Sequence, residues 1–334
     1  MAKTILGIDI GYDNLKLVLM RGGELKKAIS VPMPKNLMRD GNIISNESMG
    51  ELIRDTMKQA GLRAANAAIV LPNESVYVKN VEMPRMTADQ LAYNLPFEFH
   101  DYITDELRDY VFDYAMLDAE NDRAVDEETS STMELLAVGM RSSALEELEA
   151  ILRKAGLRMV MAAPALCAYI TLIRERQKDP DWAVQEECII DLGYQAIRMY
   201  MFRSDRHMAT RVLEIGLSGL DEVVAEAYNV DIHLAHTYLI SNYESCQNRP
   251  ECLNAYENIA VELMRAVNFY CFSNPDSQLS DVWLCGGGAA LEPLRTAIGE
   301  TLNMDVHNAA ELAPNGEKVE DCHTFLQAIG IAMS

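Results

Sequence analysis

The chain has 334 residues, of which 49% are hydrophobic, which is enough for about two domains with apolar cores. Its 51 acidic and 29 basic residues give a formal net charge of -22. Such a surface repels nucleic-acid phosphates and suits a basic protein segment as a partner.

The cysteines and the apolar stretches indicate the compartment in which the protein resides. The seven cysteines lie mostly in apolar runs without a Cys-x-x-Cys pair, which argues against a disulfide framework and for a reducing compartment. No Cys/His spacing fits a zinc site. The N-terminus lacks a signal-peptide pattern, and the longest uncharged apolar stretch, residues 159–173, is too short to span a bilayer. We therefore expect a soluble cytoplasmic protein.

The first part of the chain alternates strand and helix patterns. Residues 4–10 and 14–20 have the pattern of two strands joined by a tight turn, and the β-pattern extends to about residue 33. Residues 47–60 have helical spacing and are followed by Gly61, a typical C-cap. A short buried strand over residues 67–71 ends at Pro72.

Residues 75–140 have the pattern of an inserted α+β subdomain. Strands are predicted over 75–83, 110–117 and 132–140, and residues 118–131 form an acidic, solvated loop. Thr87 is a candidate N-cap for a helix over 88–103 that is interrupted near Pro96.

The remaining elements repeat the alternation. Helix 142–155 is closed by Gly156, and strand 157–162, helix 165–177 and an interdomain crossing over 178–187 follow. The second half begins with strand 188–192, is mostly helical over 218–274, and ends with strand 281–285, helix 289–302 and a final helix over about 321–332. One apolar helical stripe is expected at Leu253, Tyr256, Ala260, Leu263, Val267 and Tyr270.

A 13-residue pattern occurs twice, beginning at residues 9 and 191. Residues 9–21 (DIGYDNLKLVLMR) and 191–203 (DLGYQAIRMYMFR) share the pattern Asp–aliphatic–Gly–Tyr–x–x–aliphatic–basic. A repeat at half the chain length is not a solenoid period and indicates two related domains. The two turns can then face each other across a cleft.

The residue types of this turn suit phosphate and metal binding. Asp9 and Asp191 place carboxylates at the sheet edge, where they can hold Mg²⁺ through water. Gly11 and Gly193 let the backbone reverse close to a ligand, and the turn N–H groups can cradle an anion. Lys16 adds a point charge suited to phosphate. The alternative is a plain hairpin with an Asx-type turn, which the duplication disfavours.

A glycine run completes the set of motifs. Gly286, Gly287 and Gly288 follow a buried strand and precede a helix. Consecutive glycines allow the backbone to approach a flat ligand such as adenine closely, and they expose N–H groups at a helix start. Without the two hairpins, a tight strand–helix turn would explain them equally well.

Taken in order, these motifs resemble the actin-like ATPase superfamily. Its first phosphate loop corresponds to Asp9, Gly11, Tyr12, Asp13, Asn14 and Lys16, its second to Asp191, Gly193, Tyr194 and Gln195, and its adenosine loop to Gly286–Gly288. Residues 6–18, 81–103, 135–158 and 284–294 most resemble the PilM family of type IV pilus assembly proteins, a relative of FtsA. The segment 81–103 is the most specific.

The resemblance implies an α/β actin-like ATPase fold, with two duplicated ribonuclease-H-like domains around a nucleotide cleft and an inserted α+β subdomain. The implied boundaries are residues 1–74 plus 142–180 for the first domain, 75–141 for the FtsA/PilM-type insertion, and 181–334 for the second, with a mostly helical subdomain over 218–274.

The implied role is that of a cytoplasmic adaptor in type IV pilus, competence or secretion assembly. It would bind ATP with Mg²⁺, with Asp9 and Asp191 near the metal. It would also dock the short cytoplasmic tail of an inner-membrane PilN-like protein, which recruits it to the membrane without direct insertion. The insertion 75–141 and its adjoining groove would take this tail by strand addition. Self-association is left open.

The sequence departs from the superfamily pattern at six positions, four of them in the phosphate loops. Tyr194 and Gln195 stand where small hydroxyl residues are usual, and Tyr12 and Asp13 replace small residues in the first loop. Asp13 places a negative charge beside the expected phosphates, which is unfavourable without a cation. A Glu-x-x-Lys pair that commonly holds adenosine aligns with His236 and Leu239.

Four interpretations are open: two of the cleft and two that assign the chain to another class of protein. The cleft could hold or slowly hydrolyse nucleotide, since no general base stands out, or the protein could be a nucleotide-independent scaffold. A small-molecule kinase of the same superfamily would need an Asp base, and no such motif follows a strand in the first domain. An FtsA-type division protein would carry a C-terminal amphipathic helix, and this chain ends in QAIGIAMS.

Overall fold

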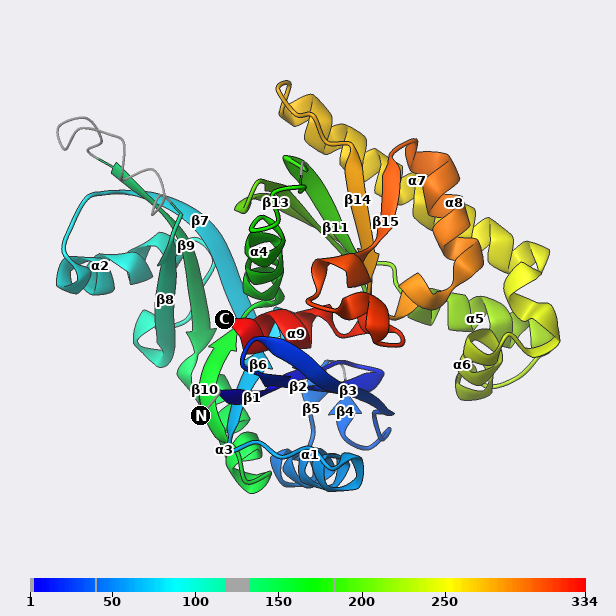
Figure 1. Ribbon diagram of the computed structural model, residues 1–334, viewed down its shortest axis with the longest axis horizontal. Coiled ribbons are helices and arrows are strands. Elements are labelled where there is room, and N and C mark those ends of the chain that lie inside the picture. Colours follow the sequence, from blue (N-terminus) through cyan, green and yellow to red (C-terminus); the bar gives the residue numbers. More distant parts are fainter. Residues whose placement is uncertain (1–2, 40, 118–131, 183) are drawn as a thin grey trace.

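The structure, a computed structural model, describes residues 3–39, 41–117, 132–182 and 184–334. Two five-stranded sheets of the same topology form its frame (Figure 1). In each sheet, three antiparallel strands are followed by two parallel ones. The first sheet has the order β3 (Glu24–Pro32), β2 (Asn14–Arg21), β1 (Thr4–Ile10), β6 (Asn66–Val70), β10 (Arg158–Ala163). The second has the order β13 (Arg206–Leu213), β12 (Ile197–Arg203), β11 (Glu186–Leu192), β14 (Asp281–Cys285), β15 (Asp305–Asn308).

Helices cover both faces of each sheet. On the outer face of the first sheet lie α1 (Asn46–Ala60) and α3 (Ser142–Lys154), which share its apolar core. The second sheet packs against α5 (Leu217–Tyr228), α6 (Ile232–Ser241), α7 (Pro250–Ser273) and α8 (Glu292–Leu302). Two helices, α4 (Ala165–Arg176) and α9 (Leu326–Met333), lie between the sheets, and their core cluster includes buried residues of both. This shared core joins the two halves.

A third, three-stranded sheet stands apart from the frame with its own core (Figure 1). Its order is β7 (Val76–Pro84), β9 (Thr132–Arg141), β8 (Tyr110–Met116), and α2 (Ala88–Asn94) packs on it. A small strand pair, β4 (Met38–Arg39) and β5 (Asn42–Ile43), follows β3. Short 3₁₀ segments complete the description: Asn73–Ser75, Leu95–Phe99, Leu107–Asp109, Tyr243–Asn248, Gly287–Ala290, Ala309–Leu312, Gly316–Lys318 and Cys322–Thr324.

Most predicted elements are confirmed, including the first hairpin and its repeat. Helix α1 ends at Gly61, whose φ of 67° is the left-handed conformation expected of a glycine C-cap. Thr87 accepts from the backbone N–H of Gln90 and forms a capping box at the start of α2. The acidic segment 118–131 lies outside the described residues. In the described part of the chain, all seven cysteines are free thiols and no helix is long and apolar enough to cross a membrane.

Three helix predictions were wrong at their ends. The helix expected over 88–103 ends at Asn94 and continues only as a 3₁₀ turn, because Pro96 lacks the N–H needed for an α-helix. The helix expected from residue 289 begins at Glu292, after the glycine run forms a 3₁₀ turn. The last helix begins at Leu326 rather than near 321, after a separate 3₁₀ turn. Leu253 of the predicted stripe is 39% exposed, whereas the other five members are buried.

Helix α9 approaches its neighbours at two glycines. A methyl group added at Gly7 of β1 would lie 1.9 Å from the carbonyl oxygen of Ala328. A methyl group at Gly330 would lie 2.2 Å from the carbonyl oxygen of Ala168 in α4. Neither backbone contact can be relieved by moving a side chain. The packing of α9 between the sheets therefore requires glycine at both positions.

We predict that Gly7→Ala lowers the free energy of unfolding by about 1–3 kcal/mol, because the methyl group forces α9 away from β1. The matched control is Gly219→Ala in α5, where an added methyl group meets nothing within 4 Å. This control should raise stability by about 0.5–1 kcal/mol, since alanine favours helix over glycine. Urea denaturation measures both, and equal effects of the two substitutions would contradict the close packing of α9.

Candidate functional site

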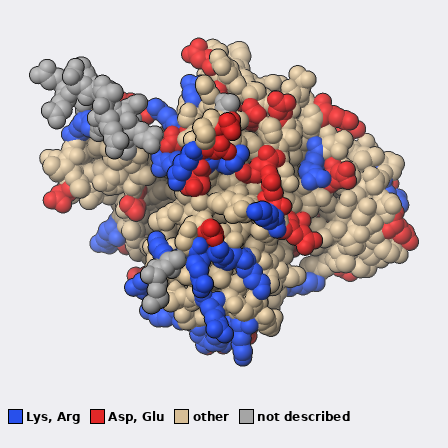
Figure 2. All heavy atoms as spheres, viewed as in Figure 1, with Lys and Arg blue, Asp and Glu red and all other residues tan. Residues whose placement is uncertain are grey.

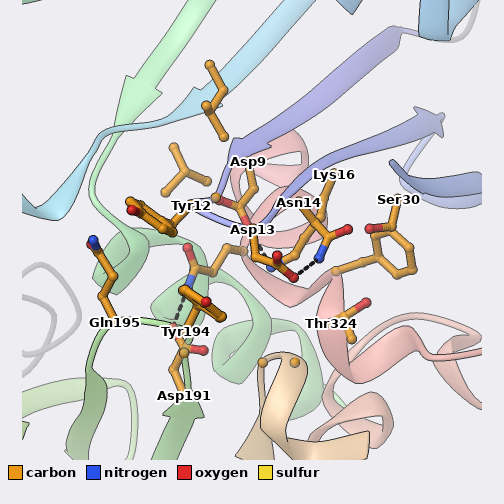
Figure 3. Close-up of a pocket in the computed structure, with 18 of the residues that line it drawn as sticks. Asp9, Tyr12, Asp13, Asn14, Lys16, Ser30, Asp191, Tyr194, Gln195 and Thr324 are labelled. Atoms are coloured by element: carbon orange, nitrogen blue, oxygen red, sulfur yellow. Dashed lines mark hydrogen bonds and ion pairs between the residues drawn. The ribbon is translucent and has the colours of Figure 1, made fainter. Parts of the chain in front are cut away.

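The two repeated turns and the glycine run open onto one cleft of about 630 Å³ between the two halves (Figure 3). This volume lies within the range of about 300–1,000 Å³ that is usual for small-molecule sites. Of the thirteen residues expected from the sequence, twelve line this cleft: Asp9, Gly11, Tyr12, Asp13, Asn14, Lys16, Asp191, Gly193, Tyr194, Gln195, Gly286 and Gly287. The exception is Gly288, which is buried, and a methyl group there would lie 2.8 Å from Cβ of Leu192.

A lysine stands between the carboxylates of the two repeats. The register of β1 and β2 pairs Asp9 with Lys16, and the Lys16 Nζ lies 3.0 Å from Oδ2 of Asp9. Burial opposes the charge on Lys16, but attraction to Asp9 and Asp191 outweighs it and raises the pKa of Lys16. Burial also raises the pKa of Asp191, and Lys16 partly offsets this effect. Lys16 therefore keeps its positive charge and offsets the negative charges of both Asp9 and Asp191.

The second repeat uses its basic residue differently. Arg198 pairs with Asp191 in the register of β11 and β12, as Lys16 does with Asp9, but its Nη2 reaches Oε1 of Glu74 at 3.0 Å. Asp191 instead accepts a hydrogen bond from Nε2 of Gln327 in α9 at 2.7 Å. The repeat alignment could have identified Arg198. No signal in the sequence pointed to Gln327.

Both turns offer backbone donors. The N–H of Gly11 donates to Asn14 O and that of Gly193 to Asp191 O, each at 3.0 Å, which closes the turns. Within the described ranges, the N–H groups of the two residues that follow each glycine donate to no acceptor (Tyr12, Asp13, Tyr194 and Gln195). Four unpaired amides beside Lys16 form a cradle that suits an anion.

The glycine run lies directly against Asp191. Gly286 has a φ of 81°, and a methyl group there would lie 2.4 Å from Oδ1 of Asp191. Only glycine combines this conformation with this approach. A ligand in the cleft can therefore contact the loop backbone and the carboxylate together.

Aromatic and charged side chains join the two turns across the cleft. The rings of Tyr12 and Tyr194 stack with centroids 5.4 Å apart and planes 11° apart, and Figure 3 shows them side by side. Nε2 of His236 lies 3.4 Å from Oδ2 of Asp13, and its Nδ1 lies 2.9 Å from Oδ2 of Asp221. The Tyr194 hydroxyl donates to the same Asp221 oxygen at 2.9 Å.

This network compensates the negative charge that Asp13 places beside the expected phosphates. Hydrogen bonds to Asp13 and then to Asp221 raise the pKa of His236 to about 10, so the imidazole is a cation at neutral pH. Asn14 also donates to Asp13, at 2.7 Å. The negative charge of the first turn is thus balanced by a helix of the other half. Sequence reasoning missed Asp221, which is fully buried in α5.

The two positions that align with the superfamily's Glu-x-x-Lys pair, His236 and Leu239, have different surroundings. Leu239 is fully buried in the core of the second half, because the position faces the sheet. Ile240, one residue further along α6, lines the cleft. His236 contacts the first turn through Asp13, as described above.

The donors present fit a cation held largely by water. In the described part of the chain, no group of three or more His, Cys, Asp or Glu residues could hold a metal ion alone. Asp9 and Asp191 each engage Oδ2 with a protein donor, and among the described residues no donor contacts Oδ1 of either. Mg²⁺ keeps several waters and typically uses one or two carboxylates together with phosphate oxygens.

Comparison with known proteins identifies the family and the fold. A family model described as type IV pilus assembly protein PilM matches residues 7–334. A solved PilM–PilN type IV pilus biogenesis complex contains a chain of the same fold, with a TM-score of 0.81 and 23% identity over 98% of this chain and 97% of that one. The ethanolamine utilization protein EutJ from Carboxydothermus hydrogenoformans follows with a TM-score of 0.62 and 14% identity, over 100% and 89% of the two chains. The expected actin-like ATPase fold is confirmed.

We predict a pH-dependent contribution of His236 to stability. Its pKa is raised from 6.5 to about 10 in the folded protein, so the stabilisation is full below about pH 6.5 and is lost as the pH rises toward 10. His236→Gln keeps hydrogen-bonding capacity without the charge. The difference in free energy of unfolding between wild type and variant should shrink across this window, measured by urea denaturation at successive pH values. A difference that stays constant would show that the His236 charge plays no part.

Proposed function

The chain belongs to the PilM family of type IV pilus assembly proteins, and from this premise we propose that it is a nucleotide-binding adaptor. It binds ATP with Mg²⁺ in the cleft between its halves and docks the cytoplasmic tail of an inner-membrane PilN-like protein. That partner recruits it to the inner face of the membrane. The apparatus served is a type IV pilus or a related competence or secretion system.

The observation that carries nucleotide binding is the convergence of the two repeated turns on Lys16. Phosphate oxygens would accept from the four unpaired turn amides and from Lys16, whose charge is retained in the buried site. Gly286, Gly287, Leu217 and Ile240 all line the cleft, and Gly287 lies beside Leu217, which suits an adenine face. This arrangement supports one nucleotide placed across both halves.

A bound Mg²⁺ would neutralise charge on the phosphates. Asp9 and Asp191 would hold it through water, because each presents one carboxylate oxygen without a protein donor among the described residues. Lys16 would then lie between these carboxylates and the phosphates and keep the site from accumulating negative charge.

Binding is proposed rather than rapid turnover. The carboxylates beside the turns are each engaged: Asp9 with Lys16, Asp191 with Gln327, Asp13 with His236 and Glu74 with Arg198. None is left as an evident general base, and the nucleotide would act as a conformational latch. At most, slow hydrolysis is expected.

One set of contacts favours a second candidate, a scaffold that works without nucleotide. The Tyr12–Tyr194 stack and the Asp13–His236 ion pair already hold the two turns together. A protein closed in this way could present its docking surfaces in a fixed arrangement. The titration below separates the two candidates.

The docking surface is proposed on the insertion. Its sheet has two edge strands, but β7 contacts the second half through Asn80, whose Nδ2 donates to the His207 carbonyl at 3.0 Å. Among the described residues, strand β8 pairs only with β9, which leaves its outer edge open, and it exposes Val111. An extended tail could add to this edge, with main-chain hydrogen bonds giving affinity, and the net charge of -22 suits a basic tail.

Domain boundaries at 1–74 plus 142–180, 75–141 and 181–334 belong to the same proposal. The three sheets are each made from one of these segments. With these boundaries, the tail docks on one unit while nucleotide contacts the other two.

For nucleotide binding, we predict that wild type binds ATP in the presence of Mg²⁺ and that Asp191→Asn weakens this binding by about 10–100-fold, as expected for a group that orders the metal's water. Isothermal titration calorimetry measures both. Asp281→Asn is the matched control, because Asp281 lies on the adjacent strand β14 and contacts His307 outside the cleft. Absence of heat from a well-folded wild type would refute the nucleotide proposal and leave the scaffold.

For docking, we predict that Val111→Asp weakens binding of a synthetic peptide of the partner's tail at least about tenfold, because it puts a charge on the free edge of β8. The control is Val212→Asp, an equally exposed valine on the edge strand β13 of the second sheet. Fluorescence polarisation with a labelled peptide measures both variants. If Val212→Asp is the more damaging substitution, the docking edge lies on the second sheet instead.

A further inference from the structure

We propose that one end of the first sheet is a contact surface for an anionic lipid bilayer. Six exposed basic residues gather there, at the N-terminal ends of the parallel strands and the C-terminal end of α1. We call this set the basic patch: Lys3, Arg21, Lys27, Lys58, Arg63 and Arg158. Figure 2 shows blue side chains concentrated over this lower part of the molecule.

Hydrogen bonds and a shared hollow connect the residues of the patch. The carbonyl of Lys3 accepts from Gly22 at 3.0 Å, and Nε of the adjacent Arg21 donates to Thr4 at 3.4 Å. Lys3 and Arg63 line one shallow hollow together with residues 62–66. Arg158 donates to Asn66, which lines this hollow, at 3.0 Å, and Lys27 donates at 2.6 Å to the carbonyl of Ala60, two residues after Lys58 in α1.

The charges of the patch are not neutralised within the chain. Among the described residues, none of the six forms an ion pair with a carboxylate, whereas the neighbouring Lys26 and Lys154 pair with Glu24 and Glu47. Lys27 and Lys58 have a local role, since cations stabilise the C-terminal end of a helix such as α1. The others have no such role. A cluster of uncompensated cations in a chain of net charge -22 indicates an anionic partner.

The surface chemistry favours lipid over protein or nucleic acid. Protein interfaces rely on central aromatic or apolar anchors. Leu62 in the hollow is buried, and the exposed apolar residues nearest in sequence, Val160 and Met161, follow Arg158 along β10 at the margin of the patch and not at its centre. Single-stranded nucleic acid needs aromatic side chains for base stacking, which the patch also lacks. Adsorption to anionic headgroups needs only clustered Lys and Arg.

The net negative charge does not prevent this contact. Charges more than about 8 Å from the bilayer are screened at physiological ionic strength, so the patch dominates when it faces the headgroups. The bilayer repels the acidic faces of the molecule when they come within this distance, so the protein binds with the basic patch facing the lipid. Strand β1 starts at the patch and ends in the cleft at Asp9, so a protein bound in this way keeps its cleft directed away from the lipid.

The test is flotation of the purified chain with vesicles of phosphatidylcholine, alone or mixed with phosphatidylglycerol. The patch variant is Lys3→Gln/Arg21→Gln/Arg63→Gln. The control, Lys178→Gln/Arg265→Gln/Lys318→Gln, removes the same number of exposed charges elsewhere. A second patch variant, Lys27→Gln/Lys58→Gln/Arg158→Gln, serves if the first is unstable. Neither nucleotide nor the tail peptide is added, so failure of the proposed function leaves the result interpretable.

Wild type should partition onto the anionic vesicles only, with binding that weakens as salt is raised. The patch variant should bind at least about tenfold more weakly, and the control within about twofold of wild type. Failure of wild type to bind anionic vesicles at low salt overturns the proposal. An equal loss of binding in the patch variant and in the control variant also overturns it. Salt-sensitive dimers in sedimentation velocity that only the patch variant abolishes would overturn it in favour of a second copy of the chain.

Discussion

The shared apolar core between the two large sheets is the constraint on which the rest of the molecule depends. Helices α4 and α9 fill the space between the sheets and contribute to one cluster with residues of both. Helix α9 approaches β1 and α4 so closely that Gly7 and Gly330 have no room for a side chain. Because the sheets are held in this way, the ends of β1 and β11 face each other and their two turns open onto one cleft.

Charge balance within the cleft follows from that placement. Two buried carboxylates at the strand ends would be costly without a cation, and Lys16 serves both. The basic residues of the two duplicated turns differ in the carboxylates that they contact. Lys16 neutralises the acid of its own repeat, whereas Arg198 reaches across to Glu74 and leaves Asp191 to Gln327. The tyrosines, in contrast, are common to both turns and stack on each other across the two halves.

The cleft, the basic patch and the inserted sheet lie at different places on the frame of two sheets. The cleft occupies the C-terminal ends of the central strands, the basic patch lies at the opposite end of the first sheet, and the inserted sheet stands to one side (Figure 1). A ligand at one of these places does not obstruct the others. Asn80 of the insertion is hydrogen-bonded to His207 of the second half, so the insertion is attached to the frame on that side.

Local sequence determined the hairpins, the glycine turns and the set of cleft residues. Strand alternation and the repeated Asp–x–Gly–Tyr pattern act over a few residues, so the pairing of Asp9 with Lys16 could be anticipated, and twelve of the thirteen expected residues do line the cleft. Tertiary structure decided which face of each helix meets the cleft. Leu239 packs into the core while Ile240 lines the cleft, and Gln327 and Asp221 reach the turns from distant elements. Hydrophobic periodicity indicates which face of a helix is buried, but which polar side chains of distant elements meet at the turns depends on how sheets and helices pack.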